Sequence, residues 1–548
     1  MRSLLVVNGP IEVCDDAGSM VEALAIENGW IVAAGSAGSA RAAIGEDHEV
    51  IDLDGKAVMP GLVDAHNHHA LGGRAALFET HVPPTATYDE LLGYVRQAAS
   101  RTPPGKWIFG GMFDIGLADR LNSAAALADL DAASDGRPVV LRDMSYHNRW
   151  ANSAAMAAAG ITDETPDPVS GTIARDPATR KATGFLMESA CGIADAAMEH
   201  QTFDQSTNRK VARHAVSILN QYGITAIQDA LTSSPMAEAV AALDREGELN
   251  AWVVASLIAH EAPLYIPGPI GRELFAIKDK FATEHVRPYF AKILLDGVPM
   301  TGTAAMIDPY KASAGFGCCY RGGTTMTLPQ LSRLLADIEK AGLAAKMHCA
   351  GDAATKLAID AIEIIRDFNG PSDARHQIAH ASLIDGDEIK RMAQLNITAE
   401  LSPMIWYPNI LGAAVSEVLE DAVLAKSFPI ADFLAGGLVI AGGSDWPVAP
   451  SPDPWIGIET LVTRRDPEGI FPGALRPEQA IPVLDAMRAF TLYGARAIGL
   501  EKDIGSLEVG KAADFVILDQ DPATCPMDDI ADTKVLSTWF GGRKVYER

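Results

Sequence analysis

The sequence has few cysteines, and it has too few basic residues to balance its acidic ones. Its six cysteines form no Cys-x-x-Cys pair and no repeated spacing, so no disulfide framework is expected. Its 45 Lys and Arg residues stand against 71 Asp and Glu residues, which gives a net charge of −26. Because that charge repels phosphate backbones and anionic membrane surfaces, neither nucleic acids nor membranes are expected partners.

Long hydrophobic runs are also missing. No window of eighteen or more residues is apolar and free of charges, which argues against a membrane-spanning helix. The apolar run at residues 4–7 is too short for a signal peptide. Together with the cysteine usage, this predicts a cytoplasmic protein. The hydrophobic fraction of 48% is enough for a sizeable core, and 548 residues suit a large barrel with attachments.

The middle of the chain alternates short apolar runs with alanine-rich helical stretches. Eight such runs predict the strands of a (β/α)8 TIM barrel, an α/β fold. They span residues 57–66, 223–230, 250–259, 288–297, 342–352, 375–382, 396–403 and 437–447. The first two runs lie about 150 residues apart, which is too far for one crossover. A long insertion is therefore expected after the first barrel strand, at about 70–220.

Both ends of the chain consist of short β-like segments. Asn-Gly pairs at 8–9 and 28–29 lie between β-branched runs and predict hairpin turns. Since chain ends often lie close together, we expect a small β-sandwich built from both termini. The expected domains are residues 1–57 for its N-terminal part, 58–504 for the metal-binding barrel, and 505–548 for its C-terminal part.

Residue types that can bind metals lie at the ends of the predicted barrel strands, which form the catalytic edge of such a barrel. His66 and His68 follow the first run, and a strand's period of two places both on one face. His348 and His380 close the fifth and sixth runs, and Asp445 follows the eighth. A single strand-end histidine is more often a structural group than a ligand. The order along successive strands is what indicates a metal site.

Lys292 lies inside the otherwise apolar fourth run, where an unpartnered ammonium group would be costly. It is either a salt-bridged or snorkelling lysine, or a neutral amine that adds CO2 to form a carbamate bridging two metal ions. Alone, Lys292 favours the first interpretation. Beside four histidines and an aspartate, it favours the second.

Several motifs resemble those of the metal-dependent amidohydrolase superfamily, and most closely the branch that includes N-substituted formamide deformylase. The similar segments are MPGLVDAHNHH, PVVLRDMSYHNRWANSAAM, KILLDGVPMTGTAAM, HCAGDAA, RHQIAHASL, GGSDWPV and GSLEVGKAADFVILDQDP. They extend over nearly the whole chain. They are specific for the family and say little about the substrate.

The resemblance implies a divalent metal centre, with two Zn²⁺ ions bridged by carboxylated Lys292. The implied ligands are His66, His68, Lys292, His348, His380 and Asp445. The first two histidines would bind the more buried ion, and the last two the more exposed one. Imidazole and carboxylate ligands suit zinc, while cobalt, manganese and iron remain alternatives.

Three positions depart from the family pattern. His69 extends the His-x-His motif and should point away from the face that His68 uses. Gly302 stands where many relatives carry an arginine, so a substrate contact is missing. Ala379 replaces an acid that commonly precedes the sixth-strand histidine, and little chemical consequence is expected.

The resemblance implies a hydrolase that cleaves a non-peptide carbon–nitrogen bond of a small molecule through a metal-bound hydroxide. Asp445 would take the proton of the attacking water and return it to the leaving amine. His147 either stabilises the oxyanion or holds the substrate, or it is a structural histidine. Asp229 fits a supporting acid better than a ligand.

Three alternative functions stay open. They are a mononuclear hydrolase acting on an ester or lactone, a deaminase of the same superfamily, and a non-catalytic scaffold. The sequence after His348 and the presence of Lys292 weigh against deamination. A complete ligand set weighs against a scaffold, and self-association into a homo-oligomer is left open. Four loop aromatics either line a substrate pocket or pack between barrel and insertion: Trp150, Trp406, Tyr407 and Trp446.

Overall fold

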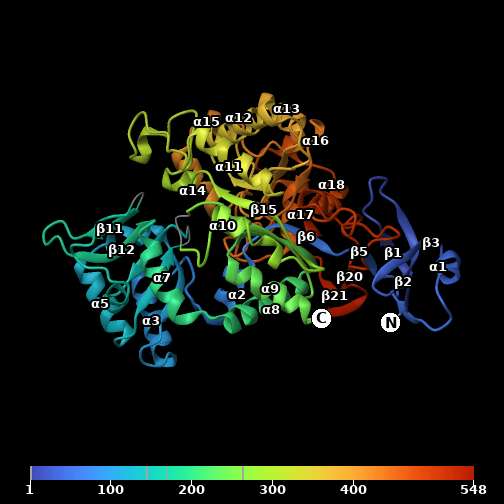
Figure 1. Ribbon diagram of the computed structural model, residues 1–548, viewed down its shortest axis with the longest axis horizontal. Coiled ribbons are helices and arrows are strands. Elements are labelled where there is room, and N and C mark those ends of the chain that lie inside the picture. The colour runs from blue at the N-terminus through green and yellow to red at the C-terminus, as the bar shows by residue number, and fades with distance from the viewer. Residues whose placement is uncertain (1–2, 144–145, 169–170, 262–264) are drawn as a thin grey trace.

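The computed structural model describes residues 3–143, 146–168, 171–261 and 265–548. Three sheets organise this part of the chain (Figure 1). A barrel sheet lies in the middle, a sheet built from both termini lies at one end of the molecule, and a sheet from residues 80–188 lies at the other. We call the latter two the terminal sheet and the insertion sheet.

The barrel sheet has eight parallel strands in chain order, as the sequence predicts. They are β6 (Leu62–Asn67), β13 (Ile224–Thr232), β14 (Trp252–Ile258), β15 (Val286–Leu294), β16 (Ala344–His348), β17 (Gln377–Ala379), β18 (Thr398–Glu400) and β19 (Ile440–Ala441). The sheet nearly closes, because the amide of Ala65 on β6 donates to the Gly442 carbonyl next to β19, at 2.9 Å. This confirms the predicted α/β barrel as a nearly closed, parallel sheet of eight strands.

Amphipathic helices cover the outside of the barrel. Helix α11 (Leu328–Lys340) begins at a capping box formed by Thr327 and Gln330. Its buried Leu331, Leu335 and Ile338 recur at helical spacing and face the strands. The same pattern lets α12 (Asp352–Asn369) pack beside it.

The first predicted strand contains two strands. β5 (Ala57–Pro60) belongs to the terminal sheet and β6 to the barrel, with Gly61 between them. A Cβ at Gly61 would lie 2.2 Å from the Thr225 hydroxyl oxygen. Glycine therefore allows the chain to pass closely over β13 as it enters the barrel.

The terminal sheet joins segments more than 450 residues apart in the chain, with β5 paired to β20. Its strands are β1 (Ser3–Glu12), β2 (Met20–Glu27), β3 (Trp30–Gly35), β4 (Glu49–Asp52), β5, β20 (Phe515–Leu518), β21 (Val535–Phe540) and β22 (Arg543–Glu547). The hairpin predicted at Asn28–Gly29 is confirmed, since both residues have positive φ between β2 and β3.

The hairpin predicted at Asn8–Gly9 is wrong. Strand β1 continues through this pair, and its register with β2 shifts between Val7 and Ile11. Asn8 takes a φ of 69°, so the pair forms a bulge. The chain at Lys56 crosses so closely that a Cβ on Gly9 would lie 2.3 Å from the Lys56 carbonyl oxygen.

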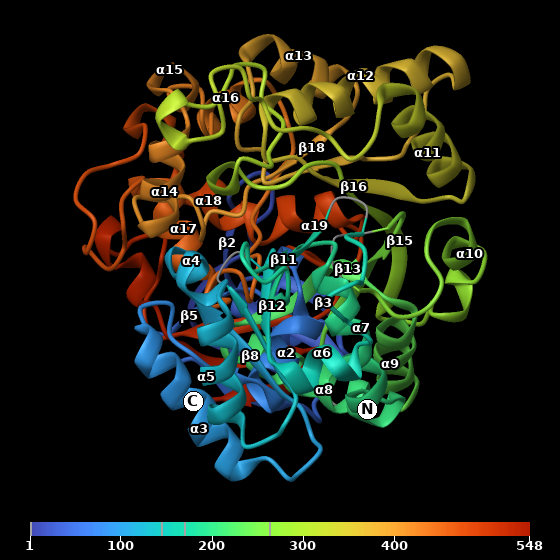
Figure 2. The same cartoon turned by 90° about the vertical axis from the view of Figure 1, so that its left-hand side faces the viewer.

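The insertion sheet lies between β6 and β13 in the chain and faces the viewer in Figure 2. Its strands are β7 (Thr80–His81), β8 (Ile108–Phe113), β9 (Val139–Asp143), β10 (Asn148–Ala151), β11 (Gly171–Arg175) and β12 (Ala182–Glu188). Helices α3 (Tyr88–Arg101) and α5 (Ala124–Ser134) pack against each other and share a core with it. Helix α8 (Gln205–Gln221) instead packs on α2 (His69–Phe78) and α9 (Ser234–Arg245), beside the barrel.

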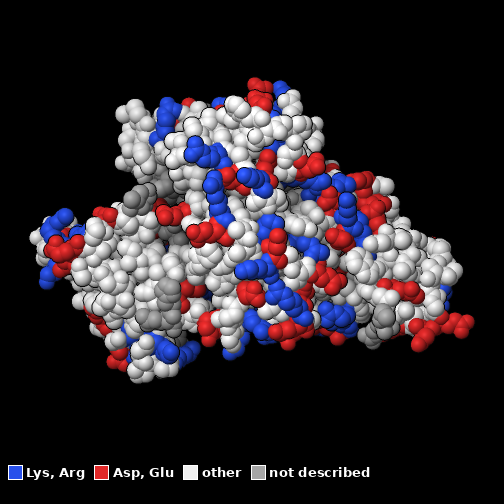
Figure 3. Space-filling view, viewed as in Figure 1, with Lys and Arg blue, Asp and Glu red and all other residues white. Residues whose placement is uncertain are grey.

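The surface shows no concentration of one charge on the face drawn in Figure 3. Lys and Arg side chains lie interspersed with Asp and Glu side chains across the barrel. Among the described helices, none is both long enough and apolar enough to cross a membrane.

Candidate metal centre and active site

The first part of the site lies where β6 meets the loop after β19. The Nε2 atoms of His66 and His68 lie 3.5 Å and 3.2 Å from the same carboxylate oxygen, Oδ1 of Asp445. His66 is fully buried, and His68 and Asp445 are largely so. Three residues separated by nearly 380 positions thus converge as the sequence predicts.

A buried hydrogen-bond network holds the Asp445 loop against β6. Both oxygens of Asp64 are used: Oδ1 accepts from the amide of Ser444 at 2.9 Å, and Oδ2 accepts from its hydroxyl at 2.6 Å. The amide of Asp445 donates to the His66 carbonyl at 2.8 Å. A Cβ on Gly443 would lie 2.5 Å from that of His66, so only glycine allows this approach.

Glu400, at the end of β18, orients His66. Its Oε2 lies 2.6 Å from His66 Nδ1, and since a carboxylate only accepts, Nδ1 carries the proton. Burial lowers the pKa of His66, which keeps the imidazole neutral and leaves a lone pair on Nε2. That Nε2 is buried and has no hydrogen-bond partner among the described residues.

His348 and His380 meet at the ends of β16 and β17, with His380 Nε2 only 3.0 Å from His348 Nδ1. The other nitrogen of His348 donates to the Gly297 carbonyl at 3.1 Å. The other nitrogen of His380 contacts the Ser402 hydroxyl at 3.1 Å, and this hydroxyl donates onward to Glu400. Both outward nitrogens therefore carry protons.

Two bare imidazole nitrogens consequently face each other. Burial lowers the pKa of His348 to about 3 and lowers that of His380 well below its usual range, so neither ring supplies a proton to the contact. Two lone pairs at this distance repel each other unless a cation lies next to them. This donor chemistry fits a metal ion, with the outward hydrogen bonds fixing each tautomer.

Lys292 lies among these groups on β15 and is 1% exposed. Burial lowers the pKa of its amine to about 8, although Asp445 and Glu400 oppose the shift. Its charge in turn lowers the pKa of His348. The fourth-strand lysine thus lies in the electrostatic field of the ligands on neighbouring strands.

A second buried lysine, Lys346, was not foreseen. Its Nζ lies 2.9 Å from the Ala65 carbonyl oxygen, 3.0 Å from Gln377 Oε1 and 3.4 Å from Gln228 Oε1. Three acceptors match the three N–H bonds of an ammonium group. Burial lowers the pKa of Lys346 to about 7, and its three hydrogen-bond acceptors lie on β6, β13 and β17.

The donor atoms that converge most closely among the described residues form two overlapping sets. Within each set the atoms lie no more than 4.8 Å apart, and the sets are His66 with His68 and Asp445, and His66 with His380 and Glu400. Both sets suit a divalent ion. Sequence reasoning missed Glu400, although the motif Thr-Ala-Glu places this acid at a strand end, where the other ligands lie.

Asp296 is a further acid that sequence reasoning did not single out. It follows β15, and its carboxylate accepts from the amides of Ala305, Ala350 and Gly351 at 2.8–3.0 Å. Its Oδ1 lies 3.8 Å from His348 Nε2. Burial raises the pKa of Asp296 to about 7. Asp296 therefore ties the loops after the fourth and fifth strands together.

His69 and His68 lie nearest different carboxylates: His68 contacts Asp445, and His69 lies beside Asp229. Its Nδ1 lies 3.6 Å from Oδ2 of Asp229 at the end of β13, and both side chains are buried. Gly302 has a φ of 73°, and a Cβ there would lie 2.8 Å from the ring of Phe316. Phe316 therefore fills the space that a side chain at position 302 would need.

His147 lies in the insertion, directly before β10. It is within electrostatic range of His348, because a positive charge on His147 would lower the pKa of His348. Its Nδ1 contacts Oε2 of Glu188 at 2.8 Å, and the Glu188 amide donates to the His147 carbonyl at 2.8 Å. Tyr146 and Glu188 flank this contact with φ values of 66° and 52°. Such backbone strain is often found at functional sites.

Comparison with known proteins agrees with this geometry. A model described as the amidohydrolase family matches residues 49–546. The chain belongs to the amidohydrolase family. N-substituted formamide deformylase from Arthrobacter pascens is 28% identical over 566 aligned residues, which cover 100% of this chain and 99% of the relative. Protein LONG AFTER FAR-RED 3 from Arabidopsis thaliana is 29% identical, and the alignment covers 100% of this chain and 92% of that protein.

Solved structures show the same fold. An uncharacterized metal-dependent hydrolase from Pyrococcus horikoshii OT3 superimposes with a TM-score of 0.78 at 22% identity, covering 96% of this chain and 99% of its own. A similar hydrolase from Pyrococcus furiosus gives 0.75 at 23% identity, covering 95% of this chain and 100% of its own. Family membership makes this amidohydrolase an enzyme that acts on carbon–nitrogen bonds other than peptide bonds, and it implies a divalent metal.

Three of the four loop aromatics pack in cores. Trp150 is fully buried in the core of the insertion sheet, and Trp406 stacks on Phe428 with ring centroids 4.6 Å apart. Trp446 packs so closely on α2 that a Cβ on Gly72 would lie 2.2 Å from its ring. Pocket lining by these tryptophans is therefore not supported.

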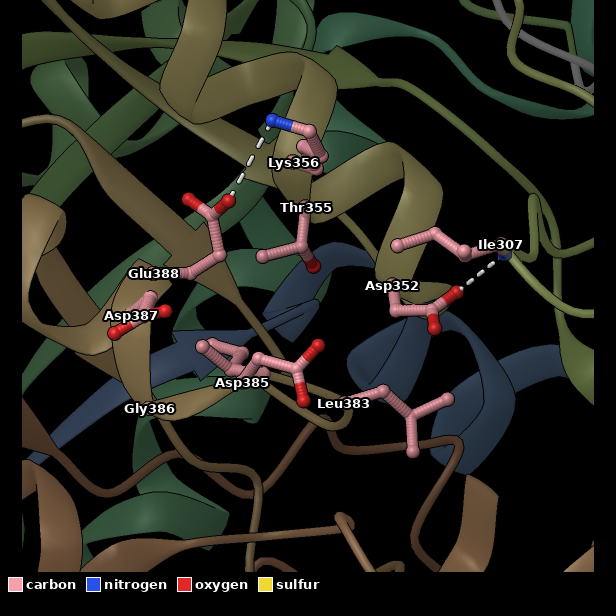
Figure 4. Close-up of a pocket in the computed structure, with 10 residues that line it drawn as sticks. Ile307, Asp352, Thr355, Lys356, Leu383, Asp385, Gly386, Asp387 and Glu388 are labelled. Carbon is pink, nitrogen blue, oxygen red and sulfur yellow. Dashed lines mark hydrogen bonds and ion pairs between the residues drawn. The ribbon is translucent and has the colours of Figure 1, made fainter. Parts of the chain in front are cut away.

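A separate cavity of about 510 Å³ lies between the starts of α12 and α13 (Gly386–Gln394) (Figure 4). Its walls are acidic, with Asp352 accepting from the Ile307 amide at 2.7 Å and Lys356 lying 3.6 Å from Glu388. None of the predicted ligands lines it. This amidohydrolase therefore keeps its histidine cluster outside that cavity.

Glu400→Gln is expected to weaken metal binding about 10- to 100-fold, because an amide holds the His66 tautomer less firmly than a carboxylate. The measurement is a chelator competition on the purified protein. Glu339→Gln is the matched control, since Glu339 also contacts a buried histidine, His376, at 2.9 Å but lies outside the cluster. Equal metal affinity in both variants would contradict the orienting role.

Proposed function

We propose that this amidohydrolase cleaves the carbon–nitrogen bond of a small non-peptide amide, with N-substituted formamides as the first substrates to test. The observation that carries the proposal is the pair of bare imidazole nitrogens of His348 and His380, 3.0 Å apart and beside buried Lys292. The full-length match to a formamide deformylase supports the substrate class.

The proposed ligands are His66, His68, Lys292, His348, His380 and Asp445, holding two divalent ions, most simply Zn²⁺. When bound, such ions polarise a carbonyl and lower the pKa of coordinated water to about 7. We assign the metal-binding barrel to residues 61–504, because β5 (57–60) lies in the terminal sheet. The segments 1–60 and 505–548 would form the small β-sandwich, and the insertion at about 70–220 would cover the catalytic edge.

Lys292 is the proposed bridging residue. Its neutral amine attacks CO2, a nitrogen–carbon bond forms, and one proton leaves, which produces an anionic carbamate. Burial supports this step, because it lowers the pKa of the amine to about 8. Burial also lowers the pKa of Lys346, but Lys346 is not the proposed bridge, because its Nζ already contacts the carbonyl oxygens of Ala65, Gln377 and Gln228.

Asp445 is the proposed proton carrier. It accepts the proton of the attacking water, whose oxygen bonds to the substrate carbonyl carbon. As the carbon–nitrogen bond breaks, Asp445 returns the proton to nitrogen, so that the product leaves as a neutral amine. The Asp445 amide donates a hydrogen bond to the His66 carbonyl, and this bond and the Asp64–Ser444 network hold the Asp445 carboxylate beside the two imidazoles.

His147 is the proposed group that holds the substrate oxyanion, with Glu188 setting its tautomer. His147→Ala is expected to lower turnover about 100-fold while metal content stays unchanged, because one oxyanion donor is lost. His81→Ala, which removes an exposed histidine of the same insertion sheet, should leave turnover unaltered. Wild-type turnover in His147→Ala would identify His147 as a structural residue.

Hydrolysis of matched N-formyl, N-acyl, ester and lactone compounds by the metal-replete enzyme tests the substrate class. Release of amine from the N-formyl or N-acyl compounds, abolished by a chelator, is the expected result. Activity confined to esters and lactones would overturn the amide proposal. Release of ammonia from amino-substituted heterocycles would favour a deaminase.

A further inference from the structure

Two adjacent cysteines lie exposed on the long connection between β15 and α11, and neither belongs to the proposed ligand set. Cys318 and Cys319 are both free thiols, and their Sγ atoms are 3.5 Å apart. We propose that this pair is a two-sulfur binding site for a soft, thiophilic ion. The proposal concerns a different site from that of the proposed function and does not depend on it.

The local backbone brings the two sulfurs to the same side. Neighbouring side chains on an extended strand point to opposite faces. Here the amide of Tyr320 donates to the Gly317 carbonyl at 3.4 Å, and the cysteines occupy the two central positions of the resulting turn. Gly317 has a φ of 104°, which favours glycine and starts the reversal.

The separation of the sulfurs suits a shared ligand. It is far longer than the roughly 2.05 Å of a disulfide. Two sulfurs each about 2.3 Å from a tetrahedral Zn²⁺ ion lie about 3.8 Å apart, and this distance serves as the reference for a two-sulfur site. The observed 3.5 Å is close to that value, so binding requires only a small adjustment of the side chains.

The turn is held firmly, which lowers the entropy cost of binding. The amide of Tyr310 donates to the Tyr320 carbonyl at 2.9 Å, and the amide of Met306 donates to the Arg321 carbonyl at 2.8 Å. The rings of Tyr310, Phe316 and Tyr320 pack together with centroids 5.5–5.9 Å apart.

The surroundings favour a cation. Cys318 lines a cavity of about 370 Å³ whose wall also carries the carboxylates of Asp308 and Glu420. Thiolate ligands select soft ions over hard ones such as Mg²⁺. Negative charge nearby attracts a cation and would repel an anionic ligand. Cadmium and trivalent arsenic compounds are the chemical class that this pair would bind.

Phenylarsine oxide is the first probe, because it bonds to paired thiols and has no affinity for imidazole. Two S–H bonds lose their protons, two arsenic–sulfur bonds form, and the arsenic oxygen leaves as water, with no oxidant needed. The reduced full-length protein should gain one equivalent by intact-mass measurement. A dithiol should remove it, and a monothiol at the same thiol concentration should not.

Three variants make the test decisive. Cys318→Ser and Cys319→Ser should each weaken binding roughly 100-fold or more, because loss of one sulfur removes the chelate. Cys525→Ser removes a partly buried single thiol elsewhere and should bind like the wild type. An adduct that survives either loop variant, or no adduct on the reduced wild type, would overturn the proposal.

Cadmium ions provide the second arm. The expected result is a sulfur-to-cadmium charge-transfer absorption in the near ultraviolet that both loop variants lose. Imidazole and carboxylate ligands give no such band, and its loss in both loop variants distinguishes the turn from any other sulfur in the protein. A band unchanged in Cys318→Ser and Cys319→Ser would also contradict the proposal. Failure of this test would leave the hydrolase proposal untouched.

Discussion

Lys292→Ala is expected to remove one or both metal ions and to lower turnover roughly 1000-fold or more. The reason is that the variant loses the anionic bridge that the carbamate would supply, and metal polarisation of a carbonyl is worth several kcal/mol. The measurements are metal stoichiometry by elemental analysis and kcat on the substrate identified by the hydrolysis panel.

Further variants at position 292 distinguish the effect of losing the bridging carbamate from the effect of losing the lysine's positive charge. Lys292→Arg should be no better than Lys292→Ala, since guanidinium forms no carbamate and stays positive. Lys292→Glu, or Lys292→Ala supplied with a short carboxylic acid, should recover part of the metal content and activity. A plain amine at position 292, one metal ion and full activity would instead support a mononuclear hydrolase.

Asp445→Asn is expected to lower kcat about 1000-fold with a smaller loss of metal than Lys292→Ala. An amide cannot accept and return the proton, and positioned acid–base groups contribute about 10²- to 10⁴-fold. The carboxamide oxygen still offers a ligand atom beside His66 and His68. Parallel measurement of kcat and metal content distinguishes lost chemistry from lost metal.

Asp453→Asn is the matched control for this variant. Asp453 lies on the same loop, is partly buried, and caps α17 (Pro454–Thr463) by accepting from the Trp455 amide. An Asn side chain also caps helices well, so activity should change by no more than a few fold. Equal activity losses in the two variants would indicate damage to the loop in place of a proton-transfer role for Asp445.

Much of the barrel and the ligand order could be predicted because they follow from local patterns. Eight apolar runs ending in polar residues predict parallel strands, and parallel strands place their ends at one edge. The spacing of His66 and His68 fixes their shared face for the same local reason. An Asn-Gly pair can form either a hairpin turn or a bulge. At Asn8–Gly9 the pair forms a bulge, where the chain at Lys56 passes close to Gly9.

The sequence by itself determined the barrel, the family and which residue types gather at its catalytic edge. Only the tertiary structure decided how they are supported. Glu400 contacts His66 and Lys346 contacts the Ala65 carbonyl, each on a strand hundreds of residues away in the chain, and the insertion brings His147 within electrostatic range of His348. Burial sets the pKa values and hydrogen bonds set the tautomers, and both arise from three-dimensional neighbours that linear spacing does not encode.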